Sequence, residues 1–263
     1  MKLEKIVSWL DKTLKAADFD DVSNNGLQVD RFAAPTQTLS TQTLKRSNPQ
    51  TISTVAFAVD ASVRAVEAAA QAGAQLLVVH HGISWGGGIK RIEGGVGNVV
   101  RAALKANLAI AAYHLPLDAH PTLGNNAQLA KLLGLKGVKP AFSYHGNVIG
   151  LTGAGPARRV REGLVRLGGA HLGEGPDLAG TVKVGVCSGG AGEFAEAAKA
   201  LGCDLYVTGE ASWGDVVAAE NVGMPMVCAG HYETEVFGVR AVAKAMRRAL
   251  KVETADLTSA GVG

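Results

Sequence analysis

The sequence predicts an α/β protein made of two interlinked, pseudo-repeated βαβαβ lobes with mixed or parallel sheets, and three observations lead to this class. Apolar runs alternate with stretches of helical period over residues 51–134 and again over 181–250, which is typical of parallel strands joined by crossover helices. The stretch "AVEAAAQAGAQLLVVHHGISW" aligns with "EFAEAAKALGCDLYVTGEASW" with one gap, which indicates an internal repeat. A chain of 263 residues that is 47% hydrophobic has enough apolar residues for one large domain or two lobes.

We expect the first lobe to cover residues 1–136, with a polar, Ser-, Thr- and Pro-containing surface insertion at 31–50. An amphipathic helix over 3–16 places Ile6, Leu10 and Leu14 on one face. The elements that follow are a strand 51–59, a helix 61–73, a strand 74–80, a helix 96–107, a strand 108–114 and a helix 125–134.

The second lobe is expected over 137–263. Its first part, 137–180, is less regular, and the repeat pattern returns after it. The predicted elements are a strand 181–187, a helix 191–202, a strand 203–209, a helix 212–223, a strand 224–230 and a long final helix 233–250 that returns to the site.

Composition narrows the function class. The net charge is +3 and the charges are dispersed, and only 5% of residues are aromatic. A nucleic-acid interface is therefore not indicated, and a small anionic substrate is compatible with this charge. The three cysteines fit no zinc or disulfide framework. We find no signal peptide and no membrane span, so we expect a cytoplasmic protein without a membrane partner.

Imidazoles and carboxylates follow the predicted strand ends, where sites form in open α/β sheets. They are His80, His81, His114, Asp118, Glu210, His231 and Glu235. These are ligand types for a divalent transition metal: zinc, iron, manganese, cobalt or nickel. Adjacent histidines before a glycine can each reach a different ion, which favours a two-metal site.

Spacing suggests how some of these residues are arranged. His231 and Glu235 are four apart, so they share one face of a helix, and Glu235 is placed to bridge two ions. Pro116 separates His114 from Asp118, so we expect that pair on an extended turn rather than a helix. The glycine-rich segment 83–95 is a candidate flap whose Lys90 and Arg91 would bind a substrate anion. The glycine-rich turn within 186–194 offers backbone N–H groups to a phosphate.

The motifs "NNGLQV", "VVHHGISW", "HLPLDAHPTLGNNAQLA", "SGGAG", "YVTGEASW" and "AGHYETE" resemble the GTP cyclohydrolase I type 2 homolog family, also called the NIF-like dinuclear metal protein family. The resemblance runs from Asn24 to Ala249, interrupted at 31–50, and matches the short form without the large central insert. It implies two α/β lobes with a dinuclear site between them, in a toroidal homohexamer built as a trimer of dimers.

The resemblance also implies a ligand set for two divalent transition-metal ions per chain. His80 would bind one ion and His81 the other, Asp118 would complete the first site and His231 the second, and Glu235 would bridge both. His114 and Glu210 fall outside this set, and we expect them at its rim as proton-transfer or substrate-contact residues.

Two functions remain open at this point. The first is a metal-dependent hydrolase that acts on a nucleotide-like or other small anionic metabolite, with GTP implied by the family name alone. The second is a non-enzymatic metal-binding regulatory, chaperone or storage scaffold. A third hypothesis, a nucleic-acid binder, is disfavoured by the modest charge and the low aromatic content.

Overall fold

The computed structural model describes residues 1–31, 51–168 and 178–260 and divides the chain into two compact units. Unit 1 combines Met1–His114 with Val242–Gly263, and unit 2 is Leu115–Ala241. Because the chain leaves unit 1 and returns to it, the units are interlinked as predicted. Their limits differ from those of the lobes 1–136 and 137–263, which remain a sequence-based division. The predicted insertion 31–50 lies, apart from Arg31, outside the described residues.

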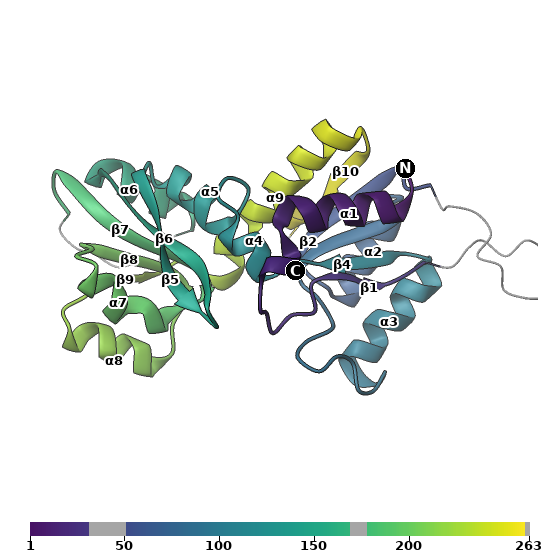
Figure 1. Ribbon diagram of the computed structural model, residues 1–263, viewed down its shortest axis with the longest axis horizontal. Coiled ribbons are helices and arrows are strands. Elements are labelled where there is room, and N and C mark those ends of the chain that lie inside the picture. Colours follow the sequence, from purple (N-terminus) through teal and green to yellow (C-terminus); the bar gives the residue numbers. More distant parts are fainter. Residues whose placement is uncertain (32–50, 169–177, 261–263) are drawn as a thin grey trace, which may run out of the picture. The chain divides into compact units, whose positions relative to one another are not determined.

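Unit 1 contains a five-stranded sheet in the order β1-β4-β3-β2-β10 (Figure 1). Strands β4, β3, β2 and β10 are parallel, and β1 pairs antiparallel with β4. The elements of this unit are α1 (Leu3–Leu14), η1 (Ala16–Asp18), β1 (Gly26–Val29), β2 (Thr54–Asp60), α2 (Val63–Gln71), β3 (Leu76–His81), α3 (Gly94–Ala106), β4 (Ala109–Ala112), β10 (Glu253–Asp256) and η4 (Thr258–Ala260).

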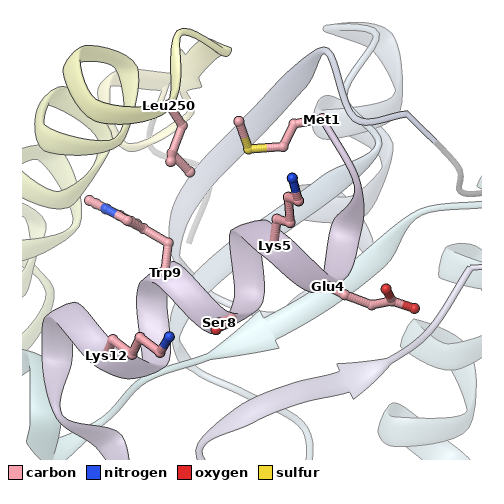
Figure 2. Close-up of a pocket in the computed structure, with 7 residues that line it drawn as sticks. All are labelled: Met1, Glu4, Lys5, Ser8, Trp9, Lys12 and Leu250. Atoms are coloured by element: carbon pink, nitrogen blue, oxygen red, sulfur yellow. The ribbon is translucent and has the colours of Figure 1, made fainter.

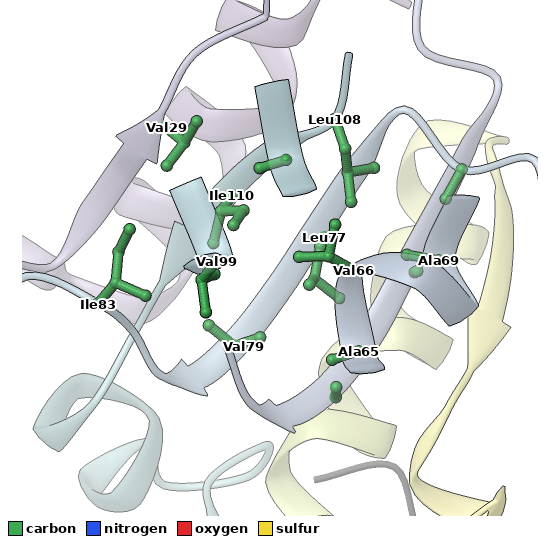
Figure 3. Close-up of a cluster of buried hydrophobic side chains, with 14 of the residues drawn as sticks. Val29, Ala65, Val66, Ala69, Leu77, Val79, Ile83, Val99, Leu108 and Ile110 are labelled. Atoms are coloured by element: carbon green, nitrogen blue, oxygen red, sulfur yellow. The ribbon is translucent and has the colours of Figure 1, made fainter. Parts of the chain in front are cut away.

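The core of unit 1 lies between one face of this sheet and helices α2 and α3 (Figure 3). Strand residues of alternating position, such as Leu77 and Val79, point toward this core, where Val66 of α2 and Val99 of α3 pack against them. The central strands β2, β3 and β4 are mostly apolar, as is typical of parallel strands that are covered on both faces.

Helix α1 buries Ile6, Leu10 and Leu14 as the spacing predicts. Its opposite side, together with Leu250, borders an open pocket of about 450 Å³ (Figure 2). The lining residues are Met1, Glu4, Lys5, Ser8, Trp9, Lys12 and Leu250. None of the predicted site residues is among them, so this pocket is separate from the candidate chemistry.

Unit 2 contains a second five-stranded sheet, in the order β5-β6-β7-β8-β9. Strands β7, β8 and β9 are parallel, whereas β6 pairs antiparallel with both β5 and β7. The elements are α4 (Leu115–Ala119), α5 (Asn125–Leu132), β5 (Lys136–Tyr144), β6 (Asn147–Pro156), α6 (Ala157–Arg166), β7 (Thr181–Gly190), η3 (Gly192–Phe194), α7 (Ala195–Ala200), β8 (Leu205–Glu210), α8 (Trp213–Asn221), β9 (Met226–Cys228) and the first part of α9 (His231–Leu250).

The structure confirms the α/β class and the repeat pattern of three consecutive parallel strands in each sheet. The less regular stretch 137–180 proves to contain a β5–β6 hairpin and helix α6. Strand β5 is mostly exposed, so it lacks the apolar alternation that marks a half-buried strand.

The expectation of an extended turn around Pro116 was wrong. Residues Leu115–Ala119 form the short helix α4, and Pro116 lies in its first turn. Proline is tolerated there because the first backbone N–H groups of a helix have no intrahelical acceptor. Asp118 thus lies on a helix. Among the described residues, no helix is both long enough and apolar enough to cross a membrane.

Candidate metal centre

Three histidines of unit 1 gather at the carboxyl ends of two neighbouring parallel strands. His80 and His81 end strand β3, and His114 follows strand β4. Each offers a ring nitrogen, and these nitrogens lie within 4.8 Å of one another. The ring of His80 lies 4.5 Å from that of His81 and 5.1 Å from that of His114, centroid to centroid. We call these three residues the histidine cluster.

Each imidazole of the histidine cluster directs Nδ1 at an oxygen acceptor. His80 Nδ1 donates to the Tyr113 carbonyl at 3.0 Å. His81 Nδ1 donates to Asp60 Oδ1 at 2.8 Å, and Asp60 is its register partner on β2. The third acceptor is Asp21 Oδ1, which lies 2.8 Å from His114 Nδ1.

These contacts determine the tautomers. A carbonyl or carboxylate oxygen only accepts, so each Nδ1 carries the proton and a neutral ring has its lone pair on Nε2. Histidines that bind metals typically donate their second nitrogen to a carboxylate or carbonyl in this way. His80 is fully buried, and the side chains of His81 and His114 are 20% and 17% exposed. The donor set of unit 1 therefore has the residues and the orientation to hold a metal ion.

Asp21, which accepts the hydrogen bond from His114 Nδ1, is held in its ionised form. Burial acts to raise its pKa, but the hydrogen bond and positive charge of His114, together with hydrogen bonds from Ser23 and Asn25, lower the pKa to about 2. Asn25 also accepts the backbone N–H of His114 at 2.8 Å. The segment before β1 thus positions the His114 ring through both its backbone and its side chain.

The loop after the histidine pair is anchored by β1. Gln28 Oε1 accepts the backbone N–H of Ile83 at 2.7 Å and that of Ser84 at 3.1 Å. A Cβ atom at Gly82 would collide with Gln28 and Ala112, so glycine is required where the chain turns away from His81.

In unit 2, Asp118 lies at the end of a buried hydrogen-bond network. Its Oδ1 accepts Ser188 Oγ at 2.9 Å and Asn125 Nδ2 at 2.8 Å. Asn125 in turn accepts the backbone N–H of Gly238 at 2.8 Å, and Asn126 accepts that of Ser188 at 2.7 Å. Helices α4, α5 and α9 and strand β7 together fix the orientation of the Asp118 carboxylate.

His231 and Glu235 meet on one face of α9, as their spacing predicts, with Nε2 and Oε1 3.3 Å apart. On the other side of the ring, Glu210 Oε1 lies 3.0 Å from His231 Nδ1. The hydrogen bond with Glu235 outweighs burial and, with the charge of Glu235 and the contact with Glu210, raises the His231 pKa to about 9. A carboxylate oxygen of Asp118 lies within 4.8 Å of one of Glu235. Unit 2 therefore gathers two buried carboxylates and an imidazole.

Two glycines allow the strand ends to approach this group. Gly189 has a φ of +68°, and a Cβ there would lie 2.5 Å from Glu235 Oε1. A Cβ at Gly209 would lie 2.8 Å from His231 Cα. Strands β7 and β8 thus bring their backbones against the first turn of α9, where a Cβ atom at either glycine would force a neighbour to move.

Two further predictions fare differently. The structure does not support the prediction that the 186–194 turn binds a phosphate. The N–H groups of Ser188, Gly189 and Ala191 already donate to side chains of the same unit. Lys90 is exposed, and Arg91 is exposed and pairs with Glu93 at 3.5 Å. Their role in substrate binding stays a prediction.

Comparison with known proteins agrees with this architecture. A family model described as Duf34/NIF3 (NGG1p interacting factor 3) matches residues 1–260. A relative from Deinococcus radiodurans is 38% identical over 91% of this chain and 86% of its own length, and one from Pyrococcus horikoshii is 35% identical over 97% and 96%. Both are named GTP cyclohydrolase 1 type 2 homolog.

Solved structures give the same picture. TTHA1606 from Thermus thermophilus superimposes with a TM-score of 0.78 at 30% identity, covering 98% of each chain. A structure titled protein ybgI, of unknown function, gives a TM-score of 0.79 at 29% identity and covers 97% of each chain. The chain belongs to the Duf34/NIF3 family, a group of α/β proteins with two mixed sheets.

Sequence reasoning missed the residues that orient the donors. They are Asp21, Asn25, Asp60, Asn125, Asn126 and Ser188. One signal was available: Asp60 ends the strand that precedes the histidine strand, and parallel neighbours end at the same edge. The others depend on contacts between distant segments.

Proposed function

We propose that this protein binds two divalent transition-metal ions per chain and uses them to hydrolyse a small anionic, nucleotide-like metabolite. The observation that carries the proposal is the common orientation of the histidine cluster, in which every Nδ1 donates to an oxygen. Such rings present a basic Nε2, the form in which imidazole binds a metal.

The proposed ligand set is the one that the family resemblance implies. His80 and His81 would each bind a different ion, Asp118 and His231 would complete the two sites, and Glu235 would bridge them. Support within unit 2 is chemical: Asp118 and Glu235 are buried carboxylates, 6% and 3% exposed, whose charge a cation would offset.

When bound by these residues, two ions would supply Lewis-acid activation of the substrate. The chain's own contribution is proton transfer and substrate orientation. His114, whose Nδ1 is held by the ionised Asp21, is suited to accept a proton at Nε2. Glu210 is 64% exposed beside His231 and would exchange protons with solvent. Lys90 and Arg91 would bind the substrate anion.

A non-enzymatic metal-binding scaffold is the second candidate. The hydrogen bonds that orient each donor side chain favour it, because tight metal binding without catalysis would also require them. A turnover assay distinguishes the two candidates, since both predict stoichiometric metal. Only the hydrolase predicts that the parent protein cleaves a substrate bond and that His114→Gln cleaves it more slowly.

Metal analysis tests the shared premise. We expect purified protein to carry close to two transition-metal ions per chain and Glu235→Ala to lose both. Glu233→Ala, an exposed carboxylate on the same helix turn, is the matched control and should keep them. A parent protein without metal, which also gains no melting temperature when zinc or manganese is added, would contradict the proposal.

The homohexamer, a trimer of dimers, belongs to the same proposal and rests on family resemblance. Light scattering coupled to size-exclusion chromatography, which gives the mass in solution, tests it. A chain mass of 27.0 kDa makes a monomer, dimer and hexamer easily distinguishable.

A further inference from the structure

We infer that Trp85 is a specificity-determining residue that stacks on a planar heteroaromatic ring of the substrate beside the histidine cluster. This inference rests on the proposed function, since it names the substrate class of the same site. Trp85 lies on the loop after β3, with its ring edge-on to His114 at 5.2 Å and 6.2 Å from that of His81, centroid to centroid. An indole is thus fixed at the rim of the cluster.

The backbone around Trp85 is firmly attached to the preceding segment. Ser23 and Trp85 form a β-bridge, and Gly86 donates its N–H to the Val22 carbonyl at 2.6 Å. Asn24 donates two hydrogen bonds to Ser84, one from its backbone N–H to the carbonyl oxygen and one from its side-chain Nδ2 to Oγ. This loop position is therefore pre-organised, which reduces the entropy lost when a ligand binds.

The polar atom of the indole is already used. Trp85 Nε1 donates to the Gly82 carbonyl at 2.9 Å. What the side chain offers to a ligand is its π surface, and Trp85 is 38% exposed. A flat ring is the ligand that gains most from an aromatic face, because stacking needs no directed hydrogen bond.

Charge on the same loop points to an anionic ligand. Lys90 and Arg91 follow Trp85 within the 83–95 segment and are exposed, and Arg91 pairs with Glu93 of the same segment at 3.5 Å. A planar ring that carries a phosphate, as in a nucleoside monophosphate, satisfies both features. Ribose 5-phosphate carries the same phosphate without the ring and isolates the contribution of stacking.

The repeat supplies a matched control. Trp213 occupies the position that aligns with Trp85, yet it is 78% exposed at the start of α8. Replacing Trp213 removes an indole of the same repeat position without touching the histidine cluster. Replacing Trp9 and Trp213 by Phe leaves Trp85 as the sole tryptophan of the chain.

The experiment uses full-length protein, metal-loaded and chelator-treated, titrated with adenosine and guanosine monophosphates and with ribose 5-phosphate. In the protein whose sole tryptophan is Trp85, we expect the nucleotides to quench the fluorescence saturably. Ribose 5-phosphate should not quench it. By calorimetry, Trp85→Leu should weaken nucleotide binding about ten-fold or more, Trp85→Phe should restore most of it, and Trp213→Leu should leave it unchanged.

Equal affinity in Trp85→Leu and parent, equal loss in Trp213→Leu, or absence of nucleotide binding would overturn the inference. The metal content distinguishes failure of the stacking inference from failure of the proposed function. Trp85→Leu should keep the parent's metal content and melting temperature. Nucleotide binding that needs Trp85 in a protein that binds no metal would retain the stacking role and remove the two-metal hydrolase.

Discussion

Asp21 Oδ1 lies 2.8 Å from Nδ1 of His114, although 93 residues separate the two in the sequence. The carboxylate side chain is 1% exposed, and its pKa is lowered to about 2 from 3.8. Because the folded pKa lies below the unfolded one, ionised Asp21 stabilises the fold fully above 3.8, and this contribution disappears as the pH falls through about 2.

Asp21→Asn should therefore cost about 2 kcal/mol of unfolding free energy at neutral pH. The difference between variant and parent should shrink as the pH approaches 2, where the parent's carboxyl is protonated too. Denaturant titrations across this range measure it, with the exposed Asp18→Asn as control. A difference independent of pH would contradict the lowered pKa of Asp21.

His231 should titrate near pH 9 in metal-free protein, because Glu235 and Glu210 flank its ring. The raised pKa means that its protonated form stabilises the metal-free fold fully below 6.5 and loses this effect as the pH rises through about 9. NMR of the ring protons measures the pKa directly. Glu235→Gln should lower it.

Metal affinity should increase with pH over the same interval. A metal ligand must be deprotonated, so binding at neutral pH displaces the His231 proton and the apparent affinity should rise about ten-fold per pH unit until about 9. Calorimetry in buffers of different ionisation enthalpy counts the protons released. Binding without proton release would exclude His231 from the ligand set.

Asp60→Asn should weaken metal binding while leaving the fold intact. The Asp60 carboxylate accepts His81 Nδ1–H at 2.8 Å, and loss of such an orienting charge typically costs 10–100-fold in metal affinity. Competition with a chromogenic chelator gives the affinity. Glu67→Gln, an exposed acid on α2 of the same unit, should behave as the parent.

Gly189→Ala should unfold more easily and hold less metal. A residue with a Cβ at a φ of +68° costs about 1–2 kcal/mol by itself, and the added atom would press on Glu235. Thermal melts and metal content measure the two effects. Gly87→Ala, where a Cβ meets nothing within 4 Å, should change neither.

Local patterns predicted the strands and the donors that share an element. Strands β2, β3 and β4 are apolar runs because they are buried on both faces, and such runs can be recognised from the sequence alone. The contact between His231 and Glu235 follows from helix geometry alone.

Partners from distant segments could not be predicted in the same way. Asp21 reaches His114 through tertiary folding, and nothing in the residues around Asp21 marks it as a partner of a histidine. The same holds for Ser188, which contacts Asp118 across 70 positions. Around Pro116 the argument from proline as a helix breaker failed, because a proline in the first turn is compatible with a helix.

The close approach of Gly189 and Gly209 to α9 has a consequence for how variants of this protein are read. At Gly189 the φ of +68° and the nearby Glu235 carboxylate disfavour a side chain, and at Gly209 a Cβ would meet backbone atoms of Gly189 and His231. Neither glycine carries a group that reacts. A mutational scan scored by activity would thus mark these two backbone positions as strictly as Glu235 itself. Counting intolerant positions would therefore overestimate the number of residues that take part in chemistry. The excess would reflect how closely the backbones of β7 and β8 pack against the first turn of α9.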